Sequence, residues 1–263
     1  MFSNRKACEI VARCNDYLLT VLQQYPRRYY GLLSIGPQTP EFSAAEIARV
    51  ASHANIVGVI INSHTNGKYL DSRKYDVIFK AAEDHGLPLY LHPNTPSSAM
   101  ADPYSPCGLA GPIWGFAAET SLHALRLMFS GVFDRFPRLK VILGHLGEGL
   151  PFWTHRLDSR IGISQMFDST GQLKRLMRKP SEYLTQNFCF STSGMNSAVE
   201  VKFVKDVMGE DNLLFAVDYP YEDTGEAVNG IECGGFSTEF KQKLYFKNAQ
   251  RIFNCDFSLS DSI

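Results

Sequence analysis

The sequence predicts an α/β protein in which a parallel sheet is arranged as in a (β/α)8 barrel. Short apolar segments alternate along the chain with segments of helical periodicity, and the apolar segments are continuous rather than alternating in polarity. Such hydrophobicity is typical of strands covered on both faces, and the βαβα order implies parallel strands. Polar residues that could carry chemistry gather at the C-terminal ends of these strands, which share one face in a parallel barrel.

The predicted elements begin with a helix. Apolar residues from Ala7 to Leu22 recur at helical spacing. Ser3 or Asn4 can cap its start, and Pro26 lies just past its end. Six strands follow, over Tyr29–Ile35, Ile56–Asn62, Pro88–His92, Leu139–His145, Phe188–Thr192 and Leu213–Asp218. The accompanying helices are predicted at Ala44–Ala54, Lys74–Glu83, Thr120–Phe129, Glu182–Asn187, Ala198–Val207 and Thr238–Phe253.

Length and composition limit the classes of protein that fit. A chain of 263 residues suits one large barrel, and no internal repeat, low-complexity segment or linker divides it, so we expect a single domain over residues 1–263. The 26 basic and 27 acidic residues form no run of five like charges. We therefore expect neither a nucleic acid nor an anionic membrane as a partner.

The cysteines and the first residues indicate a cytosolic protein. The six cysteines contain no C-x-x-C pair and lack the dense spacing of a secreted disulfide framework, so we expect reduced thiols. Residues 1–6 are not followed by the apolar region of a signal peptide, and no apolar run reaches the roughly 18 residues that span a bilayer. The chain is expected to be soluble and not exported.

Five predicted strands end in residues with functional side chains, which are Asn62, His92, His145, Thr192 with Ser193, and Asp218. A lone histidine at a strand end is more often a hydrogen-bonded structural residue. Two histidines at the ends of successive strands, followed by an aspartate at the last strand, favour function instead. Imidazole and carboxylate groups converging on a barrel mouth suit a divalent metal.

Further candidates lie close to these strand ends. Glu148 follows His145 by three residues and could orient its ring or share its proton. Arg156 offers a forked donor to a carboxylate substrate, and a surface salt bridge explains it equally well. For His64 and His123, a functional and a structural role are about equally compatible with the sequence.

Several motifs carry a resemblance to a known family. They are "LYLHP", "GPIWGFAAETSLHALRLM", "GVFDRFPRLKVILGHLGEGLPFW" and "DNLLFAVDYPYE". Together they resemble the metal-dependent aromatic-acid decarboxylase branch of the amidohydrolase superfamily, whose members include γ-resorcylate, 5-carboxyvanillate and aminocarboxymuconate-semialdehyde decarboxylases. The segment "GVIINSHTNGKYLD" is particularly similar to the 5-carboxyvanillate type. The resemblance covers nearly the whole chain.

The resemblance implies a TIM-barrel amidohydrolase fold and the non-oxidative decarboxylation of a hydroxylated aromatic carboxylic acid. It implies that His92 and Asp218 bind a divalent metal, zinc or manganese. Asp218 would pass a proton to the ring carbon, and His145 with Glu148 would help to position and protonate at the reacting centre.

The resemblance also implies contacts with the substrate and with a second subunit. Arg156 matches an arginine that reaches the substrate of a neighbouring subunit, which implies a homo-oligomer. Asn62, His64 and Tyr221 are the further candidates for binding the small aromatic carboxylate.

The strand count departs from the family pattern. A closed barrel has eight strands, whereas six are predicted here, and the two absent strands are those expected first, with a Glu-x-His or similar pair of metal ligands. We expect such a sheet to expose two parallel edges and an open apolar core.

Three interpretations remain open. The sequence is a fragment of a working decarboxylase; or it is a short protein completed by a partner chain or surviving as a non-catalytic remnant; or it is an enzyme that runs a hydrolysis or a hydration on the same scaffold. The fold alone does not decide the chemistry.

Overall fold

The computed structural model describes residues 3–169 and 175–256, and within these ranges six strands form one parallel sheet in the order β1-β2-β3-β4-β5-β6. The strands are β1 (Gly31–Ser34), β2 (Ile56–Asn62), β3 (Leu89–His92), β4 (Val141–Leu143), β5 (Phe188–Ser191) and β6 (Leu213–Leu214). Each lies inside its predicted range, so the predicted parallel α/β sheet of six strands is confirmed.

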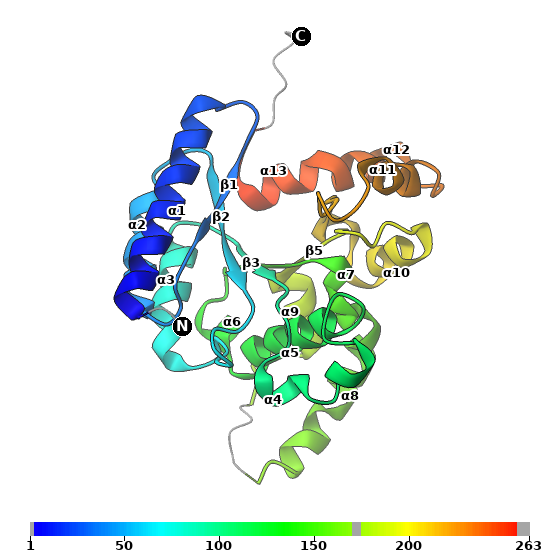
Figure 1. Cartoon of the computed structure of the whole chain (residues 1–263). Helices are drawn as coiled ribbons and strands as arrows, with labels where there is room; N and C mark the ends of the chain where they lie inside the picture. Colours follow the sequence, from blue (N-terminus) through cyan, green and yellow to red (C-terminus); the bar gives the residue numbers. More distant parts are fainter. Residues whose placement is uncertain (1–2, 170–174, 257–263) are drawn as a thin grey trace.

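Helices connect these strands and cover the sheet (Figure 1). The α-helices are α1 (Asn4–Gln24), α2 (Pro40–Val50), α3 (Asp76–Asp84), α4 (Ser98–Ala101), α5 (Gly115–Phe129), α6 (Val132–Arg135), α8 (Leu150–Met166), α9 (Pro180–Asn187), α10 (Ala198–Met208), α11 (Thr224–Glu232), α12 (Thr238–Gln242) and α13 (Asn248–Phe253). Short 3₁₀ turns are η1 (Arg73–Tyr75), η2 (Ser105–Cys107) and η3 (Glu210–Asn212), and η4 (Lys243–Lys247) is a π-helix. None of the helices in the described ranges has the length and apolarity to cross a membrane.

Some helices differ from the prediction. The helix predicted over Thr238–Phe253 is divided into α12, η4 and α13 by the π-helical turn. Helices α8 and α11 were not predicted. In α8 the reason is visible in its side chains, because Phe152 and Trp153 lie on its exposed side and remove the one-sided apolar pattern that identifies a surface helix.

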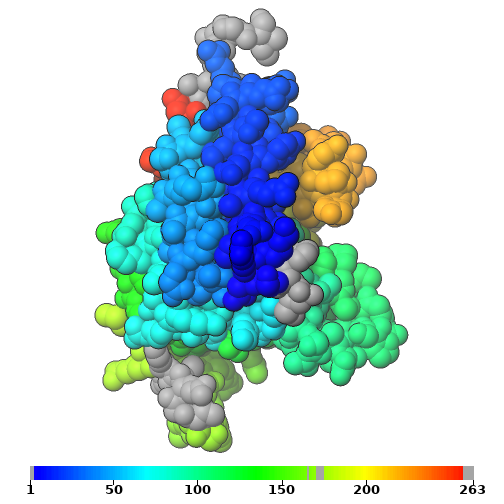
Figure 2. Space-filling view, turned by 60° about the vertical axis from the view of Figure 1, so that its left-hand side comes forward, coloured from blue at the N-terminus to red at the C-terminus, as the bar shows by residue number. Residues whose placement is uncertain are grey.

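The two faces of the sheet pack against different elements. Alternate residues of the strands, such as Val141 and Leu143, join the main core beneath the surrounding helices. Ile142 points to the other face, where Ile252 of α13 lies in the same buried cluster. In Figure 2, α1 and α2 lie side by side as dark and lighter blue columns and close one side of the molecule with side chains.

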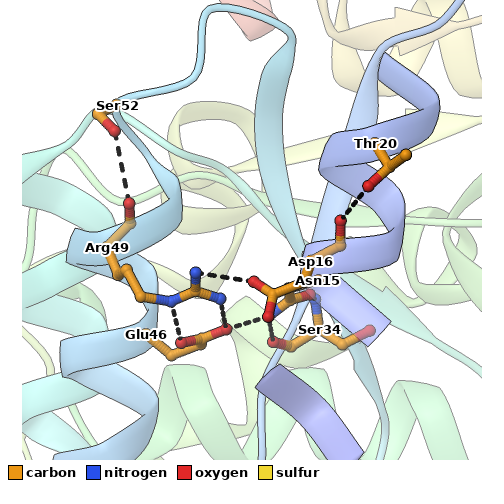
Figure 3. Close-up of polar contacts among 7 residues, drawn as sticks. All are labelled: Asn15, Asp16, Thr20, Ser34, Glu46, Arg49 and Ser52. Atoms are coloured by element: carbon orange, nitrogen blue, oxygen red, sulfur yellow. Dashed lines mark hydrogen bonds and ion pairs between the residues drawn. The ribbon is translucent and has the colours of Figure 1, made fainter. Parts of the chain in front are cut away.

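The outer edge of β1 is hydrogen bonded by a side chain of α1 (Figure 3). Asn15 is 1% exposed. Its amide nitrogen donates to the carbonyl of Ser34 at 2.9 Å, and its amide oxygen accepts from the N–H of Ser34 at 2.8 Å. One side chain thus makes both hydrogen bonds that a neighbouring strand would make at this residue.

Asn15 is held in turn by a buried carboxylate. Its amide nitrogen also donates to Glu46 at 2.8 Å, and Glu46 accepts two hydrogen bonds from the Arg49 guanidinium. These hydrogen bonds from Arg49 outweigh the effect of burial and hold the pKa of Glu46 below its ordinary value. Arg49 also pairs with Asp16 of α1 at 2.8 Å. The network therefore ties α1, α2 and the edge of β1 together.

The opposite edge is covered by the C-terminal helical segment. Asn248, which is buried, donates its side-chain amide to the carbonyl of Leu213 at 2.8 Å, and the N–H of Phe215 donates to the carbonyl of Leu244 at 2.9 Å. The hydroxyl of Tyr30, just before β1, donates to the carbonyl of Asp256 at 2.9 Å. The edges were expected to be bare, and at these positions that expectation is wrong because helices supply the missing hydrogen bonds.

We predict that Asn15→Leu lowers the free energy of unfolding by about 2–4 kcal/mol, because it leaves the N–H and C=O of Ser34 without their partners in a buried place. Urea denaturation monitored by circular dichroism measures the change. Asp16→Asn is the matched control, since its ion pair with Arg49 is solvent-exposed and should contribute less than about 1 kcal/mol. Equal losses in the two variants would contradict the role of the Asn15 amide.

Candidate functional site

Backbone strain is concentrated after the C-terminal ends of the strands. Among the described non-glycine residues, those with positive φ are Ser63 and Asn66 after β2; His145, Leu146 and Glu148 after β4; Ser193 after β5; Asp218 after β6; and Asn254. L-residues adopt this region at a cost, and such residues persist where the surrounding structure fixes them, often at functional sites. All but Asn254 follow a strand end, on the face where the sequence predicted the site.

The segment labelled α7 (His145–Glu148) is a left-handed turn rather than a helix. Every residue from His145 to Gly149 has a positive φ. Gly147 is required here, because a Cβ atom at this position would lie 2.6 Å from the Phe190 ring. The turn folds Glu148 back towards His145, and so the predicted pairing of these two residues has a defined structural cause.

His145 lies between two carboxylates. Its Nδ1 is 2.8 Å from Oε1 of Glu148, and its Nε2 is 3.7 Å from Oδ2 of Asp218. The first distance is a hydrogen bond, whereas the second is that of an ion pair. The Glu148 side chain is 2% exposed and those of His145 and Asp218 are 31% and 35% exposed. The Nδ1 side of the His145 ring is therefore held by the buried carboxylate of Glu148. The Nε2 side faces the more accessible carboxylate of Asp218.

These charges decide the protonation of His145. Burial alone would lower the pKa of the imidazole, but the hydrogen bond and negative charge of Glu148, together with the charge of Asp218, raise it above its ordinary value. The protonated form of His145 is thus favoured, and its Nε2 faces Asp218.

Three hydroxyl groups lie beside this relay. Tyr90 of β3 is 2.8 Å from Ser191 and 3.3 Å from Ser193, and the two serine hydroxyls are 2.8 Å apart. Burial and the charges of Asp218 and Glu148 raise the pKa of Tyr90, although its hydrogen bonds to the serines act the other way. The ring remains neutral and helps to fix Ser193 in its left-handed conformation.

His92 lies at the end of β3, and one of its ring nitrogens is bonded locally. Its Nδ1 is 2.8 Å from the carbonyl oxygen of Pro93. A carbonyl only accepts, so Nδ1 carries the proton and Nε2 keeps its lone pair. A backbone carbonyl on the second ring nitrogen is the usual support of a metal-binding histidine.

The described residues fit a divalent metal in the type of donor but not in the number of donors. His92 and Asp218 offer an imidazole and a carboxylate, whereas Glu148 is already bonded to His145. No group of three His, Cys, Asp or Glu side chains in the described ranges could hold a metal ion. Catalytic metal sites commonly have three protein ligands, so His92 and Asp218 alone would be too few for one.

The residues predicted to bind substrate are divided among different places. Asn62 is exposed and pairs in register with His92 on the neighbouring strand. Both ring nitrogens of His64 are used locally, because Nδ1 accepts from the N–H of Gly67 at 3.0 Å and Nε2 is 3.0 Å from the carbonyl of Thr95. Tyr221 is 86% exposed.

A buried network behind Asn62 was not predicted. Ser63 donates to Glu119 at 3.1 Å and lies 3.2 Å from Nδ1 of His123, while the N–H of Leu70 donates to Nε2 of His123 at 3.0 Å. Tyr69 donates to the second oxygen of Glu119 at 2.9 Å. Burial lowers the pKa of His123 to about 3, which keeps its ring neutral. Helix α5 thus holds both ends of the Ser63–Leu70 loop.

Arg156 shares a cavity with Glu148 but not with His145 or Asp218. It is exposed on α8 and lines a cavity of about 500 Å³ between α5 and α8, together with Trp114, Trp153 and Glu148. Asn62 and His64 line a separate cavity of about 440 Å³. The structure therefore brings together His145, Glu148 and Asp218, and leaves Arg156 on an outer surface of the same chain.

The described fold, with its candidate site residues at the strand ends, agrees with the family comparison. The family model described as Amidohydrolase matches residues 1–255. The chain belongs to the amidohydrolase family.

Curated relatives of this amidohydrolase include several decarboxylases. The γ-resorcylate decarboxylase of Polaromonas sp. (strain JS666) is 33% identical to the chain, over 94% of the chain and 77% of the relative.

Solved structures give the same picture. The 5-carboxyvanillate decarboxylase from Sphingomonas paucimobilis is 39% identical with a TM-score of 0.92, over 97% of this chain and 76% of that one. The enzyme from Novosphingobium aromaticivorans, solved with manganese and 4-hydroxy-3-methoxy-5-nitrobenzoic acid, is 38% identical with a TM-score of 0.94, over 97% and 72%. These similarities support the predicted barrel-type amidohydrolase fold.

We predict that Glu148→Gln destabilises the metal-free amidohydrolase more at pH 6 than at pH 9. The native pKa of His145 is raised, so the stabilisation is present below the unfolded pKa of histidine and is lost as the pH rises through the native pKa. The loss near pH 6 should be about 1–3 kcal/mol, the range for a hydrogen bond to a charged group. Urea titrations at several pH values measure it.

Glu200→Gln provides the control, since Glu200 is exposed on α10. If Glu148→Gln lowered the free energy of unfolding equally at pH 6 and pH 9, the charge coupling to His145 would be excluded.

Proposed function

We propose that this chain carries the non-oxidative decarboxylation of a hydroxylated aromatic carboxylic acid. The observation that carries the proposal is the Glu148–His145–Asp218 relay, which a left-handed turn holds at the strand ends of an amidohydrolase fold. The named activities of the most similar relatives and structures, which are aromatic-acid decarboxylases, support the same chemistry.

The reaction consumes one proton, and the relay is arranged to supply it. Asp218 in its protonated form passes a proton to the ring carbon that bears the carboxylate. The bond from this carbon to the carboxylate then breaks, carbon dioxide leaves, and the electron pair restores the aromatic ring. His145, whose pKa is raised by its carboxylate neighbours, returns a proton to Asp218 through Nε2, while Glu148 stabilises the imidazolium through Nδ1.

A divalent metal is part of this proposal. His92 and Asp218 would contribute an imidazole nitrogen and a carboxylate oxygen to it, and we favour manganese over zinc because a similar decarboxylase was solved with manganese. When bound, such a metal holds the oxygen substituents beside the substrate carboxylate and stabilises their negative charge.

The proposed activity predicts carbon dioxide release when the manganese-loaded protein is mixed with a panel that includes 2,6-dihydroxybenzoate and 5-carboxyvanillate. Asp218→Asn should lower kcat by about 100- to 10,000-fold, the range for loss of a general acid. Asp206→Asn, a solvent-exposed aspartate on α10, should leave kcat unchanged. Coupled carbon dioxide detection and chromatography of the products provide the measurement.

Other outcomes identify the alternative interpretations. New products without carbon dioxide would indicate a hydrolase or hydratase. Absence of both metal binding and turnover would support the non-catalytic remnant, and full activity of metal-loaded Asp218→Asn would remove Asp218 from the proton transfer.

A second part of the proposal is that the chain forms a homo-oligomer. The exposed side of α8 carries Phe152 at 71% and Trp153 at 49% exposure, and Trp114 across the cavity is 54% exposed. Clustered exposed aromatic side chains beside an arginine are typical of protein interfaces. We therefore retain the homo-oligomer, with Arg156 serving the substrate of the adjacent subunit.

Co-expression of Arg156→Ala with Asp218→Asn tests this arrangement. Each variant alone should be inactive or severely impaired, whereas random pairing into symmetric dimers should restore up to about one quarter of the wild-type rate, because half of the sites in mixed dimers contain both residues. Light scattering gives the subunit number. Failure of the mixed sample to recover activity, despite mixed dimers seen by native mass spectrometry, would place Arg156 outside the partner's site.

The cytosolic location also remains part of the proposal. All six cysteines are free thiols in the structure, as a reducing compartment requires.

A further inference from the structure

The cavity beside β1 and β2 contains polar groups that the proton relay does not use. Its volume is about 440 Å³, which is within the range of small-molecule sites. Apolar walls come from Ile35, Pro37 and Ile60, and the polar lining includes the side-chain amides of Gln38, Asn62, Asn66 and Asn94.

The position of the cavity connects it with the candidate active site. Asn62 is the residue opposite His92 in the register of β2 and β3, and Asn94 follows His92 by two residues. A ring bound beside His92 would therefore lie close to this cavity. Such a place is suited to a ring substituent distant from the reacting carboxylate.

Some polar side chains that line the cavity are already hydrogen bonded within the protein, and others are not. His64 and Asn94 are engaged, because both His64 nitrogens bond locally and the Asn94 oxygen accepts from the N–H of Thr95 at 2.8 Å. The side chains of Gln38, Asn62 and Asn66 make no hydrogen bond to other residues in the described ranges. Each of these three amides offers both a donor and an acceptor.

The charge of the cavity limits what it can bind. No Asp, Glu, Lys or Arg side chain lines it. A second carboxylate would lose hydration on entering without gaining a cation, which is costly. A hydroxyl or ether oxygen loses less and can use the free amide groups.

The loop that carries Asn66 is fixed from behind. Glu119 and His123, both fully buried, hold Ser63, and His123 also accepts from the N–H of Leu70. The loop that carries the Asn66 amide is therefore preorganised, and binding there requires little further ordering of this loop.

We propose that this cavity is a specificity subsite for an uncharged hydroxyl or alkoxy substituent of the aromatic acid, recognised by the amides of Gln38, Asn62 and Asn66. The proposal rests on the proposed decarboxylase function and specifies its substrates. It assigns discrimination between ring substituents to neutral amides rather than to a cationic side chain of this chain.

Calorimetric titration of the manganese-loaded protein with three unreactive nitro analogues tests the subsite. They are 4-hydroxy-3-methoxy-5-nitrobenzoic acid, the same ring without the methoxy group, and the same ring with a carboxylate in its place. The methoxy ring should bind about five- to tenfold more tightly than the unsubstituted ring, as one or two net hydrogen bonds allow. The dicarboxylate should bind more weakly than either.

Variants identify the groups responsible. Asn62→Leu and Asn66→Leu should each reduce the preference for the methoxy ring to about twofold or less, with little change for the unsubstituted ring. Asn62→Ser should retain part of the preference, and Asn229→Leu, at an exposed position on α11, should retain all of it. Thermal melts check that each variant is folded. If either Asn62→Leu or Asn66→Leu fails to fold, the other variant still tests the subsite.

The outcomes separate the subsite from the proposed function. Equal affinity for the three rings, preference for the dicarboxylate, no measurable binding, or equal losses for all rings in the variants would overturn the subsite. Ring preference that depends on Asn62 and Asn66, together with no carbon dioxide release from any acid, would uphold the subsite and reject decarboxylation.

Discussion

A parallel sheet that is not closed on itself leaves backbone N–H and C=O groups unpaired along two strands, and the architecture described above depends on how these groups are satisfied. Buried asparagine side chains and a helical carbonyl do so at Ser34 on β1, at Leu213 on β6 and at Phe215 just after β6. An edge treated in this way is covered by helices rather than presented to another strand. The strands then keep their parallel order, and their C-terminal ends meet on one face.

On that face, left-handed backbone and polar side chains support one another. His145 is turned towards Asp218 by residues in an unfavourable conformation, and its bond to Glu148 helps to hold that conformation. Ser63 is held by Glu119 and His123 in the same manner, from a helix far away in the sequence. At these two strand ends the strain is thus offset locally by side-chain hydrogen bonds.

Features that depend on residues close together in the sequence could be predicted, whereas contacts between distant residues could not. Continuous apolar runs identified all six strands of the described sheet, because strands covered on both faces consist mostly of apolar residues. The three-residue spacing of His145 and Glu148 was enough to predict their pairing. The roles of Asn15 and of the Glu119–His123 pair were not recognised, because their bonding partners are distant in the sequence. Asn15 bonds to Ser34, 19 residues away, and His123 bonds to Ser63, 60 residues away. Helix α8 was missed because the aromatic side chains of Phe152 and Trp153 are exposed, which removes the one-sided apolar pattern of a surface helix.

The contact between Tyr30 and Asp256 has a consequence for how the molecule is made. These residues are 226 positions apart, whereas Asn15 and Ser34 are 19 apart. During synthesis the β1 edge can therefore be covered early, and each later strand pairs with the one made just before it, as the order of the sheet requires. The growing edge stays open until the segment that contains Asn248 has left the ribosome. Helix α13, which begins at Asn248, thus covers the edge of β6 to which a further strand could otherwise pair. Until this helix docks, the nascent chain is most exposed to pairing with a wrong strand.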